Sequence, residues 1–241
     1  MKKLILSILF ILCLSFQASA WNPMVVVSGG GAVDHCTTTE CAGCDGQERM
    51  ECGSTDGNEE LTWATDAAGT TINFDYTTTV LSGTESLYLD GDAIVSTTFA
   101  DHTTIYVTAI LRCQGSATQA FLYLGDGGTY GLALQALWVT DHYVLKVHYN
   151  GITVASQGTT EFVDDQKVYV KFRYIKGTGA DGQIDTWIET DNPFVGWDLQ
   201  NDIGNSTDQY TIDQIRLKGD LAATDGTIFD DIRWDADDIS Y

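Results

Sequence analysis

Alternation of side-chain character along three consecutive segments constrains the fold of this chain more than any other feature. Residues Tyr143–Tyr149, Lys167–Ile175 and Gln183–Thr190 each send one set of alternating side chains to one face and a more polar set to the other. A period of two residues is typical of β-strands with one face in a core and one in water. The polar sets contain Lys, His, Tyr, Arg, Asp, Trp and Glu, so the three segments predict a shared polar surface on a sheet.

The same pattern continues through the chain from Glu59 onward. About a dozen short segments of this kind follow one another at intervals of roughly 8–12 residues. Turns such as Asp90-Gly91 and Asn150-Gly151 favour antiparallel hairpins. No segment keeps a helical period for more than two turns, and the chain contains two prolines. The predicted fold class is therefore all-β: an antiparallel two-sheet β-sandwich or jelly roll, with a disulfide-stapled N-terminal arm.

The first twenty residues have the pattern of a secretory signal peptide. Lys2 and Lys3 precede an apolar run that ends before Ala18-Ser19-Ala20, a small-residue cleavage motif. The apolar run is shorter than the ~20 residues of a membrane-spanning helix. We therefore expect residues 1–20 to be a signal peptide, residues 21–58 to form the arm, residues 59–241 to form the jelly roll, and the mature protein to be secreted.

The charge of the chain argues against two classes of partner. The sequence has 34 acidic and 12 Lys and Arg residues, a formal net charge of −22. Nucleic acids and anionic membranes are bound by clustered basic residues, so neither is an expected partner. Five of the basic residues nevertheless fall between Lys146 and Lys176, which is the region of the predicted polar surface.

The arm contains a cysteine cluster and an apolar segment. In a secreted chain the cysteines predict two local disulfides, with the pairing left open, among Cys36, Cys41, Cys44 and Cys52. The alternative, a metal site that includes His35, matches no established zinc spacing. Val25, Val26 and Val27 precede three glycines. They predict either an edge strand of the chain's own sheet or an assembly strand that adds to a neighbouring subunit.

Six segments follow one another in an order that resembles a known family: Asn73–Tyr76, Ser82–Leu89, Val168–Tyr174, Ile184–Ile188, Ile212–Leu217 and Thr227–Trp234. Over residues 59–241 this order resembles the concanavalin A-like lectin/glucanase (laminin G-like) jelly-roll family. The resemblance implies two curved antiparallel sheets, and many members bind carbohydrate or Ca²⁺ at the concave face or rim. No family ligand motif is matched position for position, so the resemblance implies the fold and leaves the activity open.

The predicted polar surface has the composition of a carbohydrate-binding face. Aromatic rings stack on sugar rings, and charged groups bind hydroxyls or acidic sugars. The expected ligand-binding residues are His148, Tyr169, Lys171, Arg173, Asp185 and Trp187. The alternative is a solvated sheet face with cross-strand ion pairs, for example Arg173 with Asp185.

Catalysis by this surface has weaker support in the sequence. Asp185 and Glu189 lie four residues apart on one strand, about 13 Å at ~3.3 Å per residue. That exceeds the roughly 5–9.5 Å between the carboxylates of glycosidases. A lyase built on His148, Tyr169, Lys171 and Arg173 is chemically feasible, since a Tyr or His base beside cations can abstract a proton.

Calcium is the expected cofactor, because Asp-rich turns offer hard oxygen ligands. Asp90, Asp92 and Asp126 are the candidate ligands, although none belongs to an EF-hand loop. The sequence as a whole predicts a secreted, non-catalytic carbohydrate-binding or adhesive surface module whose partner is a glycan. The alternatives are a self-assembling subunit of an extracellular filament or surface layer, and a polysaccharide lyase or hydrolase.

Overall fold

A computed structural model describes residues 46–48, 63–67, 69, 71–83, 85–149, 152–153, 158–178, 181–190, 198–205, 210–219 and 226–239. All of them belong to a compact unit that spans Asp34–Tyr241. The predicted signal peptide, the assembly strand Val25–Val27 and the four clustered cysteines lie outside the described residues. Within the described part of the chain, no helix is long and apolar enough to cross a membrane.

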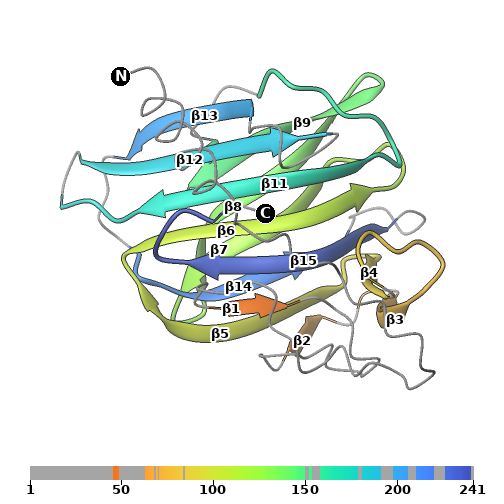
Figure 1. Ribbon diagram of the computed structural model, residues 1–241, viewed down its shortest axis with the longest axis horizontal. Helices are drawn as coiled ribbons and strands as arrows, with labels where there is room; N and C mark the ends of the chain where they lie inside the picture. The colour runs from red at the N-terminus through yellow and green to blue at the C-terminus, as the bar shows by residue number, and fades with distance from the viewer. Residues whose placement is uncertain are drawn as a thin grey trace, which may run out of the picture. The chain divides into compact units, whose positions relative to one another are not determined.

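The described strands form two antiparallel sheets, as the sequence predicted (Figure 1). The larger, sheet A, has the order β13-β12-β11-β6-β15-β4-β3, and β1 also pairs with β15. Its strands are β1 (Gly46–Glu48), β3 (Thr71–Tyr76), β4 (Ser86–Asp90), β6 (Thr104–Cys113), β11 (Lys167–Ile175), β12 (Gly182–Glu189), β13 (Asp198–Asn205) and β15 (Thr227–Asp235).

The second sheet, sheet B, has the order β10-β9-β8-β7-β14-β5-β2. Its strands are β2 (Ala64–Ala67), β5 (Ile94–His102), β7 (Gln119–Asp126), β8 (Thr129–Val139), β9 (His142–Tyr149), β10 (Ile152–Thr153) and β14 (Ile212–Lys218). Strands β7 to β10 follow one another as a meander. Strand β14 returns from a distant part of the sequence to lie between β7 and β5.

The core lies between the two sheets and is built by the alternation of each strand. Tyr143, Leu145 and Val147 of β9 are all 0% exposed, and Phe172 and Tyr174 of β11 are equally buried. Burial of one such large side chain stabilises the fold by roughly 1.5–3 kcal/mol. The intervening residues of each strand therefore point away from the core, so each sheet has one outer face that can carry function.

The expectation that three consecutive strands share one polar surface is wrong. Strand β9 belongs to sheet B, whereas β11 and β12 belong to sheet A. In a sandwich the outer faces of the two sheets point in opposite directions, because both inner faces contact the same core. The alternation of the three segments was predicted correctly, but the polar residues of β9 lie on the other side of the molecule from those of β11 and β12.

A loop between β3 and β4 covers one end of the outer face of sheet A. Leu81 of this loop packs with Ile110 and Ile228 in a small apolar cluster outside the main core. The Asp230 carboxylate fixes the loop, since it accepts 2.8 Å hydrogen bonds from the Ser82 amide and the Ser86 hydroxyl. The loop therefore covers the outer face of sheet A around Ile110 of β6 and Ile228 of β15.

Candidate functional site

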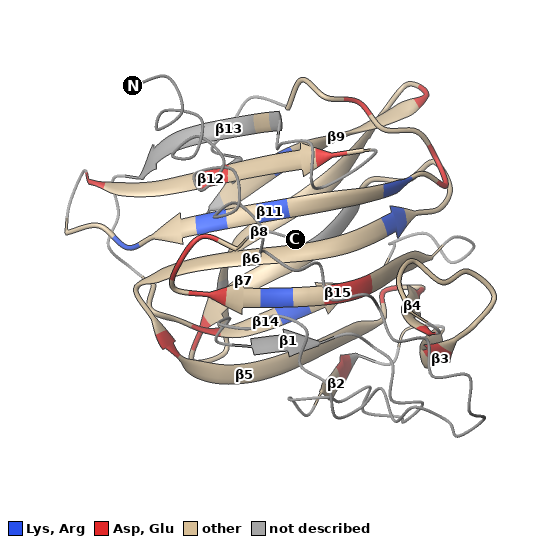
Figure 2. Ribbon diagram, viewed as in Figure 1, with Lys and Arg blue, Asp and Glu red and all other residues tan. Residues whose placement is uncertain are grey.

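Four of the predicted ligand-binding residues come together on the outer face of sheet A. The register of β11 and β12 pairs Lys171 with Trp187 and Arg173 with Asp185. Figure 2 shows blue bands along β11, the strand that carries both basic residues. Cross-strand pairs of this kind bring side chains within contact distance, so the expected grouping of these four residues is present.

These side chains are already paired within the chain. Arg173 forms an ion pair with Asp185, and the Lys171 ammonium lies 2.8 Å from an Asp238 carboxylate oxygen. Both cations also lie over the Trp187 indole, with Lys171 Nζ 4.8 Å and Arg173 Cζ 5.6 Å from the ring centroid. Cation–π contacts and ion pairs together join these side chains in one network, in which each cation has both an acidic and an aromatic partner from the same chain.

The network is more buried than a solvated sheet face would be. Lys171 is 6% exposed and Asp185 is 1% exposed. Burial lowers the pKa of Arg173, but its hydrogen bonds to Tyr106 and Asp185 outweigh that effect and raise the pKa above its ordinary value. The Arg173–Asp185 ion pair is therefore present, as expected if this face is stabilised by cross-strand pairs instead of binding a ligand. The pair involves two of the six expected ligand-binding residues.

Tyr169 lies on the same face, nearer to the loop that covers it. In the register it faces Glu189, two residues along β11 from Lys171. Its half-buried ring packs against the cluster of Leu81, Ile110 and Ile228. The structure thus places Tyr169 in an apolar contact beside the four-residue network.

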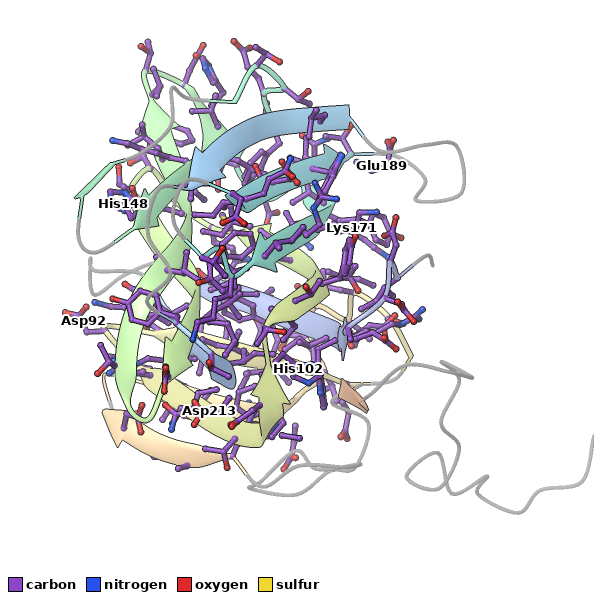
Figure 3. All side chains as sticks on the ribbon, turned by 90° about the vertical axis from the view of Figure 1, so that its left-hand side faces the viewer. Asp92, His102, His148, Lys171, Glu189 and Asp213 are labelled. Carbon is purple, nitrogen blue, oxygen red and sulfur yellow. The ribbon has the colours of Figure 1, made fainter. Side chains whose placement is uncertain are left out.

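His148 lies on the opposite side of the sandwich from Lys171 (Figure 3). In β9 it alternates with the buried Val147, so its ring points away from the core on the outer face of sheet B. The expectation that His148 joins Tyr169, Lys171, Arg173, Asp185 and Trp187 on one face is therefore wrong. The physical reason is the change of sheet between β9 and β11, which strand alternation does not reveal.

His148 is part of a different group of polar side chains, here called the polar row. The registers of β14, β7, β8 and β9 align Arg216 with Tyr123, Tyr123 with Ala133, and Ala133 with His148. At ~4.8 Å between strands, Tyr123 and His148 are about 10 Å apart in the backbone. Ala133, which is 7% exposed, lies between them in the register, so the row has a larger polar group on each side of a small buried side chain.

Gln135 completes the polar row at its His148 end. It lies two residues from Ala133 on β8, diagonal to His148, and its Oε1 is 2.8 Å from His148 Nε2. The amide oxygen is an acceptor, so the contact assigns the ring proton to Nε2 and leaves Nδ1 unprotonated in the neutral ring.

The electrostatic environment keeps the His148 ring neutral. Burial lowers the pKa of His148 below its ordinary value of 6.5, and the nearby positive charge of Lys146 lowers it further. Both effects disfavour the charged imidazolium. A neutral, half-buried imidazole on an outer sheet face can accept a hydrogen bond or a proton at neutral pH.

The other end of the polar row is fixed by an acidic residue. Arg216 Nε lies 3.4 Å from an Asp66 carboxylate oxygen, and the Ser96 hydroxyl donates a 2.9 Å hydrogen bond to the other Asp66 oxygen. The Arg216 side chain is 25% exposed, so a ligand on the outer face of sheet B can reach it. It can therefore pair with a ligand oxygen while Asp66 holds it in position.

The sequence reasoning missed Tyr123, Gln135 and Arg216. Each alternates with buried residues, for example Tyr123 between Leu122 and Leu124, so the sequence does indicate that each points outward. It does not indicate that β14 lies beside β7, because 85 residues separate Asp126 from Thr211. The polar row exists through this long-range pairing.

The predicted calcium ligands do not form a metal site in the described residues. The Asp92 carboxylate is 2.8 Å from Lys218 Nζ, and Asp126 accepts a 3.0 Å hydrogen bond from the Thr211 amide. Asp90 is 8% exposed, and one of its buried oxygens has no hydrogen-bond partner. Across the described part of the chain, no three His, Cys, Asp or Glu side chains are grouped for metal binding.

Comparison with protein-family models and with curated proteins gives no match for this chain. Solved structures do resemble it. The marine PL-14 alginate lyase from Aplysia kurodai has a TM-score of 0.55 at 8% identity, over 83% of this chain and 100% of the lyase. The exoplasmic/lumenal domain of VIP36, in a form bound to Ca²⁺ and mannose, has a TM-score of 0.52 at 11% identity, over 78% and 89%.

A third likeness is the carbohydrate esterase vb_24B_21 from the Shiga toxin-encoding bacteriophage phi24B. Its TM-score is 0.54 at 12% identity, over 78% of this chain and 98% of the esterase. At identities this low the likenesses bear on the fold alone. Together they show that the chain folds as a jelly-roll sandwich that fits the concanavalin A-like type at a coarse level.

Proposed function

We propose that this protein binds a glycan across the outer face of sheet B, at the polar row of Arg216, Tyr123, Ala133, His148 and Gln135. The Tyr123 ring stacks on a sugar ring, and the neighbouring sugar lies along the row toward His148. Gln135, His148 and Arg216 bind hydroxyl or carboxylate oxygens. The predicted signal peptide at residues 1–20 supports an extracellular role for this module.

One observation supports this choice of face above the others. The polar row aligns Arg216, Tyr123 and His148 across four adjacent strands, and an extended ligand can contact all of them at once. On sheet A, by contrast, the corresponding polar groups are more deeply buried, with Lys171 6% and Asp185 1% exposed. Jelly rolls similar in fold include a mannose-bound VIP36 domain and an alginate lyase. A glycan ligand for this protein is compatible with both likenesses.

The binding test is isothermal titration calorimetry of the full-length protein with a panel of neutral and uronate-containing oligosaccharides. Tyr123→Ala is expected to weaken the best ligand about tenfold, because an aromatic contact contributes ~0.5–1.5 kcal/mol beyond the area it buries. Tyr123→Phe keeps the ring and is expected to keep most of the affinity. Unchanged affinity in Tyr123→Ala would exclude this site.

A lyase reaction at the same row is the second candidate, and the state of His148 favours it. A neutral imidazole with a lowered pKa can abstract the proton next to a uronate carboxylate, as a general base. In this β-elimination the carbanion electrons form a C=C bond, and the leaving sugar oxygen takes a proton from the Tyr123 hydroxyl. Arg216 pairs with the uronate carboxylate and stabilises the added negative charge.

Ultraviolet absorbance of unsaturated uronate products separates the two candidates. If the protein is a lyase, wild type releases these products from uronate polymers, and both Tyr123→Phe and His148→Ala lose turnover. If it is a binding module, no product forms, and Tyr123→Phe binds like the wild type. The Tyr123→Phe variant thus divides a stacking role of the ring from a proton-transfer role of the hydroxyl.

A further inference from the structure

We propose that the outer face of sheet A holds a second glycan-binding site, in which a uronate carboxylate replaces the Asp238 carboxylate on the Lys171 ammonium. This site is separate from the polar row, because Lys171 and His148 lie on opposite sides of the sandwich (Figure 3). The proposal does not depend on the function proposed for sheet B.

Lys171 has the surroundings of a built carboxylate site. Its side chain is 7% exposed, and its Nζ donates a 2.8 Å charge-assisted hydrogen bond to Asp238. The same ammonium lies 4.8 Å from the centre of the Trp187 ring. The ammonium therefore already binds a carboxylate beside an aromatic surface, and the chain itself supplies that carboxylate.

Asp238 covers Lys171 from the solvent side. Its own side chain is 63% exposed, so the buried ammonium lies directly beneath a surface carboxylate. Loss of the Asp238 carboxylate alone would leave a buried ammonium without this partner, which is costly. Exchange for a carboxylate from solution keeps the ammonium paired and so avoids that cost.

The segment that carries Asp238 is held at both sides of this residue. The Asp237 amide donates a 2.7 Å hydrogen bond to the Asp235 carboxylate, and Ile239 is 5% exposed. These contacts fix the backbone on both sides while the Asp238 side chain remains at the surface. A rotation of that side chain moves its carboxylate away from the ammonium with no unfolding of the segment.

The position of Trp187 identifies the class of ligand. Trp187 is partly exposed, so a sugar ring beside Lys171 can make an apolar contact with the indole. The charge of Arg173 is engaged by Asp185 and by its 3.5 Å hydrogen bond to the Tyr106 hydroxyl, so we assign the ligand's charge to Lys171. A sugar ring that contacts Trp187 and also bears a carboxylate for Lys171 is a uronate.

Competition by Asp238 has a measurable consequence. A ligand that binds an open form has an apparent affinity reduced by the fraction of molecules that are open. Asp238→Asn weakens the internal contact and keeps the size of the side chain. The expected result is several-fold tighter binding of a uronate oligosaccharide, because the internal carboxylate competes less for Lys171.

The experiment is calorimetric titration in a full-length Tyr123→Ala background, in which the sheet B site is expected to bind about tenfold more weakly. Asp237→Asn is the matched control, since it removes one exposed acidic charge from the same segment without touching Lys171. Asp238→Glu restores the charge and is expected to restore competition. A neutral oligosaccharide of equal length is expected to bind all variants alike.

Three results would overturn the proposal. Asp238→Asn could fail to bind the uronate more tightly than its parent, or Asp237→Asn could strengthen binding equally. A peptide with the sequence Asp-Asp-Ile could bind where the uronate does not, which would identify a peptide site. Lys171→Gln is expected to lose binding. If that variant does not fold, the Trp187 indole N–H resonance is expected to shift on uronate addition, and an unmoved resonance contradicts the site.

Discussion

His148 is the residue whose chemistry depends most on its neighbours. A free imidazole is partly protonated near neutral pH, whereas burial and Lys146 lower the pKa of this one. Its 2.8 Å contact with Gln135 fixes the ring and its tautomer. A histidine that is neutral, oriented and half-buried is suited either to accept a sugar hydroxyl hydrogen or to take a proton.

The titration of His148 can be followed directly by nuclear magnetic resonance. Its midpoint is expected to lie below 6.5, the ordinary value for the side chain. Lys146→Gln removes the repulsive charge and is expected to raise that midpoint, whereas Lys167→Gln on sheet A is expected to leave it unchanged. A wild-type midpoint at or above 6.5 would contradict the environment described for this ring.

The pH dependence of stability follows from the same shift. A histidine with a lowered pKa in the folded state takes up protons more readily when unfolded, so it opposes folding as the pH falls through the unfolded value of 6.5. His148→Gln is therefore expected to lose less stability than wild type between neutral pH and the acidic side of 6.5. Denaturant unfolding at several pH values measures this difference.

Asp185 and Arg173 show what a cross-strand pair does for β11 and β12. Asp185 is 1% exposed, and besides Arg173 it accepts a 3.1 Å hydrogen bond from Gln183. Asp185→Ala leaves the guanidinium without its carboxylate and is expected to destabilise the fold by roughly 2–3 kcal/mol. Asp92→Asn, at an exposed turn pair with Lys218, is expected to stay within about 0.5 kcal/mol. Equal losses in urea unfolding would contradict this account.

Asp230 has the corresponding role between β15 and the loop after β3. It is 0% exposed and accepts hydrogen bonds from the Ser82 amide and the Ser86 hydroxyl. Asp230→Ala leaves these donors without an acceptor and is expected to cost roughly 2 kcal/mol or more. Hydrogen exchange of the Ser82 amide is expected to rise at the same time. An unchanged exchange rate would mean that other contacts hold the loop.

Asp230 also predicts a pH effect of known sign. Burial raises the pKa of Asp230 well above its ordinary value, and the hydrogen bonds from Ser86 and Ser82 offset part of that rise. An acid with a raised folded pKa contributes stability that is present below the unfolded pKa and is lost as the pH rises through the folded value. The stability gap between wild type and Asp230→Ala is therefore expected to shrink with rising pH.

Strand-level features were largely predictable from sequence, and strand neighbours were not. Alternation located β9, β11 and β12 within one or two residues, because it is a local property of the chain. Whether β9 and β11 share a sheet depends on how the chain between them connects the two sheets. Local alternation of side chains does not indicate this connection. The expected face therefore contained Lys171, Arg173, Asp185 and Trp187 correctly and His148 wrongly.

At the scale of the whole molecule, the two outer faces of the sandwich differ in how their charges are used. On sheet A, Lys171 and Arg173 are paired with acidic side chains and stacked on Trp187. On sheet B, Arg216, Tyr123, His148 and Gln135 form a row that crosses several strands. In a chain of net charge −22, the cation Arg216 at one end of this row can pair with a ligand carboxylate or hydroxyl, and the neutral histidine at the other end can bind a hydroxyl.

The most direct test of the proposed glycan site compares two glutamines on opposite faces by calorimetry with the best-binding oligosaccharide. Gln135→Ala changes the polar row, and Gln183→Ala changes the outer face of sheet A. The account predicts several-fold weaker binding in Gln135→Ala and wild-type affinity in Gln183→Ala. Weaker binding in Gln183→Ala together with wild-type affinity in Gln135→Ala would contradict it and move the main glycan site to sheet A.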